Sequence, residues 1–185
     1  MICLFKICWV TDMLYVFLEG PDDERFFSKV MAALLGECHY VLYANMPNSK
    51  VNNYIKSIDQ TPTSDYIFLV DGDGKSIEDR KSCIMSKYTK LSIEKVFVVQ
   101  FEIESWYYAG ASEDDCHKLK LRHFIFCTDN LTKEEFQSKL VRTSDKKYIM
   151  DSLLDIYSLQ YAVTRNHSLM IFTQAVYEKA YSAVS

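Results

Sequence analysis

YIFLVDGDG, at residues 66–74, is the stretch that decides the fold, because an uncharged run ends in two carboxylates and two glycines. Five apolar residues bounded by turn residues are typical of a strand that is buried on both faces. Residues 14–23, LYVFLEGPDD, show a similar pattern earlier in the chain. Both runs deliver acidic groups at a carboxyl end, which in open α/β sheets is the edge at which ligands bind.

The segments around these two runs alternate between strand and helix patterns. Strands are expected at residues 14–19, 39–43, 66–70 and 95–101, with helices at 22–35, 49–58 and 76–88. Gly36 is expected to end the first of these helices. Apolar strands separated by helices predict an α/β fold with a mainly parallel central sheet flanked by helices. Right-handed crossovers then bring the carboxyl ends of the strands to one edge.

The second half of the chain is more polar, and its pattern is mostly helical. Thr132 and Glu135 have capping-box spacing and open a short helix through Leu140. Further helices are expected at 145–156 and 168–182. The chain therefore divides into an α/β core at 13–110, a helical C-terminal part packed on that core at 111–185, and an N-terminal extension at 1–12.

Length and composition indicate an ordinary globular protein. The chain has 185 residues, of which 49% are hydrophobic and 25% charged, and this suits one domain with a small helical appendage. No apolar run approaches the roughly 20 residues that span a bilayer, so no membrane partner is expected. The net charge of −4 argues against a passive nucleic-acid binder, but less against a metal-dependent nuclease, whose acidic ligands are offset by cations.

Cysteine use and the first residues favour a cytoplasmic protein. The six cysteines show no CxxC spacing and the four histidines do not flank them at zinc-finger intervals, so no zinc site is expected. Scattered cysteines fit free thiols in a reducing compartment. The start of the chain lacks the positive region and the cleavage site of a signal peptide. Translation from Met1 and from Met13 both stay open.

The spacing of the acids predicts that several of them meet. Asp71 and Asp73 are two residues apart, so on an extended strand they point the same way, and Gly72 allows close backbone approach. Glu19 ends the first strand, and Asp23 follows about one helical turn later.

A third strand end repeats this arrangement with Glu102 and Glu104. Carboxylates gathered at one edge repel one another unless a cation lies between them. Oxygen ligands suit Mg²⁺ or Mn²⁺, and four to six carboxylates are enough for two ions about 3.5–4 Å apart. The sequence therefore predicts a divalent-metal site for chemistry on phosphates.

These residues resemble a known family. Glu19-Gly20 after one hydrophobic strand and Asp71-Gly72-Asp73 after a later one look like the TOPRIM domain, a Rossmann-like fold of topoisomerases, bacterial primases, the 5S ribosomal RNA maturase and the overcoming-lysogenization-defect nucleases. The resemblance covers roughly residues 13–110. EGPDDERFF at 19–27 is closest to the nuclease branch. EIESWYYA at 102–109 and RNHSL at 165–169 resemble small standalone bacterial TOPRIM-like proteins, some of them found in defence loci.

The resemblance implies a role for each acid. The metal ligands would be Glu19, Asp23, Asp71, Asp73, Glu102 and Glu104. The catalytic group would comprise Glu19 as a ligand or general acid/base, Asp71 and Asp73. Lys75 joins this group because it directly follows the two aspartates, as a candidate contact for phosphate, with a solvated surface lysine as the alternative. Gly74-Lys75-Ser76 departs from topoisomerases and primases, which usually carry a further acid or an Ala-Gly pair there. The chain has no room for a tyrosine-nucleophile domain and no ATPase domain, so neither strand passage nor ATP-driven activity is implied.

The leading hypothesis is a metal-dependent nuclease that cleaves phosphodiester bonds in DNA or RNA. A catalytically silent TOPRIM-fold module that binds a partner is one alternative. A phosphohydrolase or nucleotidyl-transfer enzyme acting on a small phosphorylated substrate is another. Nucleic acid is the expected partner, and an ATPase or another operon partner stays open.

Two further groups of residues have simpler explanations. The aromatic residues Trp106, Tyr107 and Tyr108 are expected to pack beneath the sheet rather than to stack on bases. The basic stretch made by Lys118, Lys120, Arg122 and His123 is expected to be a solvated face rather than a guide for a nucleic-acid backbone.

Overall fold

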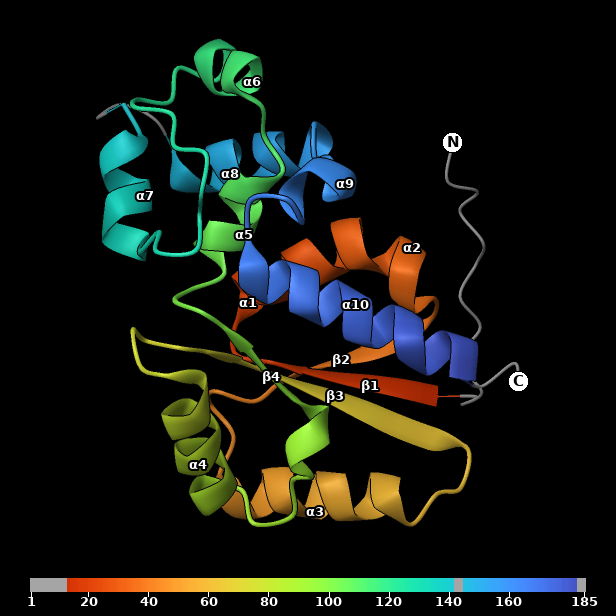
Figure 1. Cartoon of the computed structure of the whole chain (residues 1–185). Helices are drawn as coiled ribbons and strands as arrows, with labels where there is room; N and C mark the ends of the chain where they lie inside the picture. The colour runs from red at the N-terminus through yellow and green to blue at the C-terminus, as the bar shows by residue number, and fades with distance from the viewer. Residues whose placement is uncertain (1–12, 142–144, 183–185) are drawn as a thin grey trace.

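A four-stranded parallel sheet organises the part of the chain that the computed structural model describes, residues 13–141 and 145–182. Its strands are β1 (Met13–Leu18), β2 (Cys38–Leu42), β3 (Ser64–Asp71) and β4 (Val96–Val99), in the order β2-β1-β3-β4 (Figure 1). Each pair of neighbouring strands runs parallel. The predicted α/β fold with helices around a parallel sheet is confirmed.

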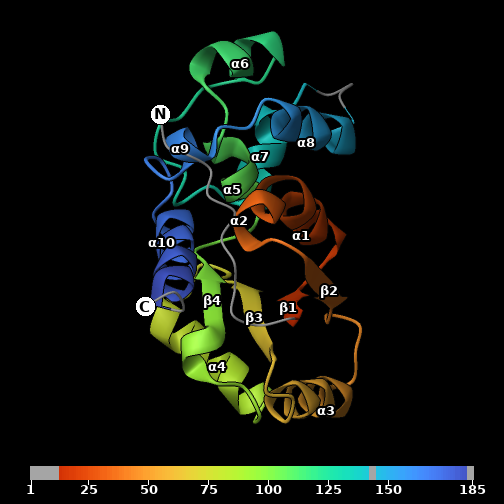
Figure 2. The same cartoon turned by 90° about the vertical axis from the view of Figure 1, so that its right-hand side faces the viewer.

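Helices cover both faces of this sheet (Figures 1 and 2). One face carries α1 (Pro21–Phe26), the π-helical turn η1 (Phe27–Met31), α2 (Ala32–Leu35) and α10 (His167–Ser182). The other face carries α3 (Asn48–Asp59) and α4 (Ile77–Lys87). The expected end of the first helix at Gly36 is confirmed, because Gly36 caps α2 with a positive φ of 74°.

Each face has its own apolar core. On the α3 and α4 side, Phe17 and Phe68 stack with ring centroids 5.3 Å apart. On the α1 and α10 side, Trp106 lies between Phe26 and Phe172, at centroid distances of 5.7 and 5.5 Å. The Trp106 indole N–H donates to Ser168 Oγ at 2.9 Å. Trp106 is therefore a core residue, as expected, and is not available to stack on a base.

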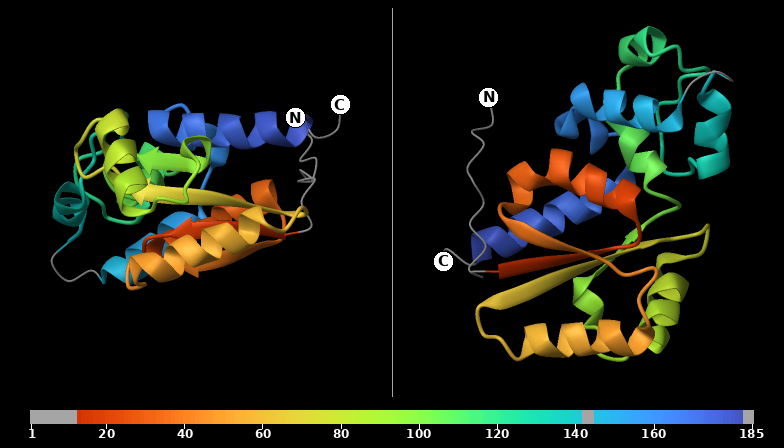
Figure 3. Two further views of the ribbon diagram at one scale, coloured as in Figure 1. Left: turned by 90° about the horizontal axis from the view of Figure 1, so that it is seen from below. Right: turned by 180° about the vertical axis from the view of Figure 1, so that it is seen from behind.

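A group of short helices after β4, made of the last helix of the α/β core and the helices of the C-terminal part, lies on the same side of the sheet as α1 (Figures 1 and 3). A 3-10 turn η2 (Ile93–Lys95) precedes β4, and the helices after it are α5 (Glu104–Ala109), α6 (Glu113–Lys118), α7 (Lys133–Lys139), α8 (Lys146–Asp155) and α9 (Leu159–Ala162). The capping box of Thr132 with Glu135 is confirmed at the start of α7. The two short helices α6 and α9 were not predicted as separate elements.

A buried arginine ties this helical part together. Arg165 is only 2% exposed, and its guanidinium donates to backbone carbonyls, including those of Ala109 at 2.8 Å and Phe126 at 2.8 Å. The next residue, Asn166, donates to Thr128 Oγ1 at 3.0 Å. The RNHSL stretch thus fixes the end of α5 and the start of α10 and has a structural role.

The end of β3 is pressed against the chain that leaves β4. The Gly72 N–H donates to the carbonyls of Val99 at 2.7 Å and Phe101 at 2.9 Å. A Cβ atom at position 72 would lie 2.2 Å from the Gln100 carbonyl oxygen, so only glycine fits. This approach brings the segment that carries Glu102 and Glu104 next to Asp71.

Three expectations concern membrane contact, thiols and the N-terminal extension. Among the described residues, none of the helices is long and apolar enough to cross a membrane. The four described cysteines, Cys38, Cys83, Cys116 and Cys127, are free thiols, as expected. Residues 1–12, with Cys3 and Cys8, lie outside the described residues.

Replacing Gly72 by alanine is expected to destabilise the fold by about 1–3 kcal/mol, because the new methyl group collides with backbone. The measurement is the midpoint of urea unfolding. Gly20→Ala is the matched control: a Cβ there meets nothing nearer than Asp23 Oδ2 at 3.7 Å, and the cost should stay below about 1 kcal/mol. An equal loss of unfolding free energy in Gly72→Ala and Gly20→Ala would contradict the close backbone approach at Gly72.

Candidate metal centre

Acidic side chains from the ends of β1 and β3 and from the first turns of α1 and α5 lie together at the carboxyl edge of the sheet. Glu19 directly follows β1, Asp23 lies in the first turn of α1, and Asp71 is the last residue of β3. Glu104 is the first residue of α5 and is 3% exposed. Asp71 is repelled by the charges of Asp23, Glu19, Glu104 and Glu102, so all five groups belong to one electrostatic cluster. We call these five residues the acidic cluster.

Three carboxylate oxygens of the acidic cluster are buried without a hydrogen-bond partner among the described residues. They are Glu19 Oε2, Asp23 Oδ1 and Asp71 Oδ1. The other oxygen of Asp23 accepts the Gly20 N–H at 2.7 Å, which orients the side chain at the start of α1. Unpartnered buried oxygens cost free energy, and a cation between them would remove that cost.

The pKa values of two acids of the cluster, Asp71 and Asp23, are raised, as expected where a counter-charge is missing. Burial raises the pKa of Asp71 to about 9, helped by repulsion from Asp23 and Glu19. Burial likewise raises the pKa of Asp23 to about 7, although the hydrogen bond from Gly20 opposes the shift. Tyr43 lies against the same acids, and burial raises its pKa while its hydroxyl donates to the Leu69 carbonyl at 2.9 Å.

A lysine from the C-terminal part reaches the other side of the acidic cluster. Lys146, the first residue of α8, places Nζ 2.7 Å from Glu104 Oε1 and 3.6 Å from Asp22 Oδ2. Sequence reasoning missed this residue, because position 146 is far from the acids along the chain and lies in no motif. No ion pair within the described residues involves Glu19, Asp23 or Asp71.

Asp73 departs from its expected place beside Asp71. β3 ends at Asp71, and Asp73 has a positive φ of 52°, so the alternation of an extended strand does not continue to it. Its side chain is exposed and pairs with Arg80 Nη2 at 3.2 Å, while Arg80 Nε donates to the Asp71 carbonyl at 2.5 Å. Asp73 therefore points toward Arg80 on α4, and the shared point with Asp71 that the residue spacing predicted is not seen.

Neither Glu102 nor Lys75 lies at the end of a strand. Glu102 lies in the loop after β4, and Lys75 lies in the turn after β3. β4 ends at Val99, and Glu102 accepts the Lys133 N–H at 2.5 Å, which caps α7. Glu102 is half-buried, and burial and Glu104 raise its pKa against the effect of that hydrogen bond. Lys75 is exposed in the turn after β3, where its backbone N–H donates to the Gly72 carbonyl at 3.0 Å.

The acidic cluster is not a finished coordination shell. Across residues 13–141 and 145–182, no three His, Cys, Asp or Glu side chains already surround a point at which an ion could bind. The acids are close enough to repel, and three of their oxygens have no partner. Carboxylate oxygens are the ligands that a hard divalent cation takes together with water.

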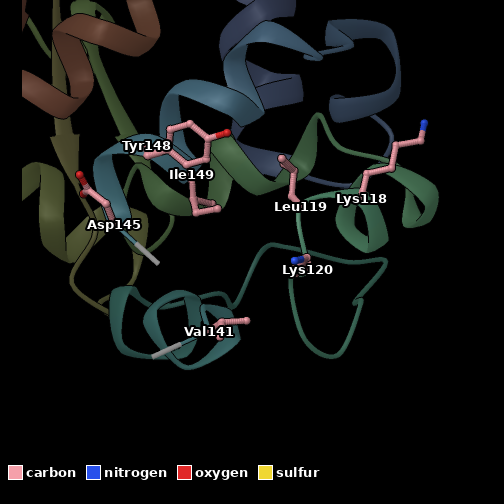
Figure 4. Close-up of a pocket in the computed structure, with 7 residues that line it drawn as sticks. All are labelled: Lys118, Leu119, Lys120, Val141, Asp145, Tyr148 and Ile149. Carbon is pink, nitrogen blue, oxygen red and sulfur yellow. The ribbon is translucent and has the colours of Figure 1, made fainter. Parts of the chain in front are cut away.

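A separate pocket of about 450 Å³ lies along the first turns of α8. Figure 4 shows its lining residues, which are Lys118, Leu119, Lys120, Val141, Asp145, Tyr148 and Ile149. Two residues of the predicted basic stretch thus line a hollow that also contains an exposed tyrosine. Lys146, which contacts the acidic cluster, lies between Asp145 and Tyr148 in the chain, so α8 connects the two places.

Comparisons of the chain with protein-family models, with curated proteins and with solved structures found no match. What the site can do is therefore inferred from its geometry and charge.

Asp71→Asn is expected to stabilise the metal-free protein by about 1–3 kcal/mol at pH 8, because Asp71 is ionised in the unfolded chain at this pH and must take up a proton when it is buried on folding, a cost that asparagine does not have. Asp71 has a folded pKa near 9 against an ordinary value of 3.8. Its ionisation therefore favours the unfolded chain, and stability is lost as pH rises from about 4 toward 9. Urea unfolding in EDTA at pH 5 and pH 8 measures the effect.

The gain from Asp71→Asn should shrink toward pH 4, where Asp71 is protonated in both states. Glu37→Gln, at an exposed position before β2, is the matched control and should change little. An Asp71→Asn protein that is less stable than wild type at pH 8 would show that Asp71 already has a compensating partner.

Proposed function

We propose that this chain is a metal-dependent nuclease that cleaves phosphodiester bonds in DNA or RNA with Mg²⁺ or Mn²⁺. The observation that carries the proposal is the set of three unpartnered carboxylate oxygens of Glu19, Asp23 and Asp71. They lie where neighbouring parallel strands β1 and β3 end, the edge at which α/β sheets bind ligands. The resemblance to TOPRIM nucleases, with its Rossmann-like core, supports the same assignment.

The residues of the acidic cluster would have different roles in metal binding and proton transfer. Glu19, Asp23 and Asp71 would hold the ion. Glu19 would also act as a general acid/base, through the carboxylate oxygen that does not bind the ion. A divalent ion bound there lowers the pKa of a coordinated water and offsets charge on the scissile phosphate. Tyr43 lies behind the acidic cluster and fixes the end of β3 by donating a hydrogen bond to the Leu69 carbonyl. Lys75, exposed beside the same edge, would contact a phosphate of the substrate.

The surroundings of the acidic cluster favour a polymeric substrate over a small phosphate ester. α8 carries Lys146 into the cluster and also lines the pocket that contains Lys118, Lys120 and the exposed Tyr148. Lysines neutralise backbone phosphates, and exposed aromatic rings stack on bases. A strand whose phosphate lies at the acids would therefore find a stacking surface on α8. It would also find the positive charge of Lys118 and Lys120 at the end of α6, so the proposal gives this basic stretch the role of guide in place of the expected solvated face.

The direct test incubates supercoiled plasmid and single-stranded RNA with Mg²⁺ or Mn²⁺. Cleavage by wild type should fall at least about 100-fold in Asp71→Asn and stay unchanged in Glu37→Gln. Asp73→Asn should lose less, below about tenfold, because Asp73 is exposed and paired with Arg80.

Other outcomes point elsewhere. Metal binding without cleavage of either polymer would favour a silent partner-binding module. Phosphate release from nucleotides alone would favour a phosphohydrolase. Cleavage that persists in Asp71→Asn would contradict the proposal.

A further inference from the structure

The ammonium of Lys146 lies where a second metal ion would be expected in the acidic cluster. Glu104, which the resemblance assigns to the metal shell, already has this cation 2.7 Å away. The inference drawn from this contact rests on the proposed function, because it concerns how many ions the same site binds.

The position of Lys146 is fixed from both sides. Its backbone begins α8, whose N-cap Asp145 accepts the Lys147 N–H at 2.9 Å. Its Nζ also lies 3.6 Å from Asp22 Oδ2, and Asp22 is held in turn by Arg25 at 2.9 Å. The Glu104 side chain is 4% exposed, so solvent screens this pair weakly.

The acidic cluster therefore has two unlike halves. Glu19, Asp23 and Asp71 have unpartnered oxygens and no cation within the described residues. Glu104 instead forms an ion pair with Lys146, whose ammonium also pairs with Asp22. A divalent ion bound to Glu104 would have to lie beside the ammonium, where like charges repel at short range, or displace it, which would break the ion pairs of Lys146 with Glu104 and Asp22.

We propose that Lys146 replaces a second divalent ion, so that the site binds one ion, between Glu19, Asp23 and Asp71. Lys146 provides the fixed positive charge on the Glu104 side and faces the same substrate phosphate from there. The site is then asymmetric, unlike a pair of ions that clamps the attacking and leaving oxygens alike. The C-terminal part, through α8, completes the charge balance of the site on the sheet.

The test counts bound Mn²⁺ by isothermal titration calorimetry and by equilibrium dialysis on the whole chain. Wild type should bind one Mn²⁺. Lys146→Met keeps a long unbranched side chain but removes the ammonium from Glu104 and Asp22, and it should bind two. Lys147→Met is the matched control: this exposed neighbour on the same helix faces no acid of the cluster among the described contacts, and it should bind one.

Two acid variants keep the test decisive if Lys146→Met does not fold. Glu104→Gln should retain one Mn²⁺, whereas Asp71→Asn should lose it, with affinity at least about 100-fold weaker. Loss of binding in Glu104→Gln would overturn the inference, because Glu104 would then be a ligand of the first ion.

The failures of the two proposals are distinguishable. Two ions in wild type, or a single ion in folded Lys146→Met, would overturn the role of Lys146 and leave the metal-dependent nuclease standing. No Mn²⁺ bound by wild type would overturn both.

Discussion

Repulsion between carboxylates held together at the end of a sheet is the constraint on which the rest of this structure depends. The fold keeps four acidic side chains close enough to Asp71 to repel its charge, and burial raises the pKa of Asp23 and Asp71 far above the ordinary range. Such an arrangement opposes folding in the absence of a counter-charge. It persists only if the surrounding packing is strong enough to offset it.

That packing is concentrated around α5 and the end of β3. Gly72 lets β3 lie against the chain leaving β4, which brings α5 to the acids. Trp106 anchors α5 in the core among Phe26 and Phe172, and Arg165 binds the carbonyls at its far end. The helical C-terminal part thus stabilises the position of α5 beside the acids and also contributes Lys146 to the site.

The sequence predicted what depends on local patterns. The strands and main helices follow from apolar runs, helical spacing and the stop at Gly36, and the capping box at Thr132 marked α7. Glu19, Asp23 and Asp71 meet because parallel strands share one edge, and topology alone implies this. The expectations failed where the backbone leaves regular geometry, as at Asp73, whose positive φ turns it toward Arg80. Lys146 could not be predicted, since only the packing of α8 brings it to Glu104.

The most direct measurement is anomalous diffraction from crystals soaked with Mn²⁺. The account predicts one peak, about 2.1 Å from Glu19 Oε2, Asp23 Oδ1 and Asp71 Oδ1, with the Lys146 ammonium still beside Glu104. Crystals with no peak at these oxygens, or with Mn²⁺ bound only elsewhere on the protein, would contradict the claim that the buried acids form a metal site.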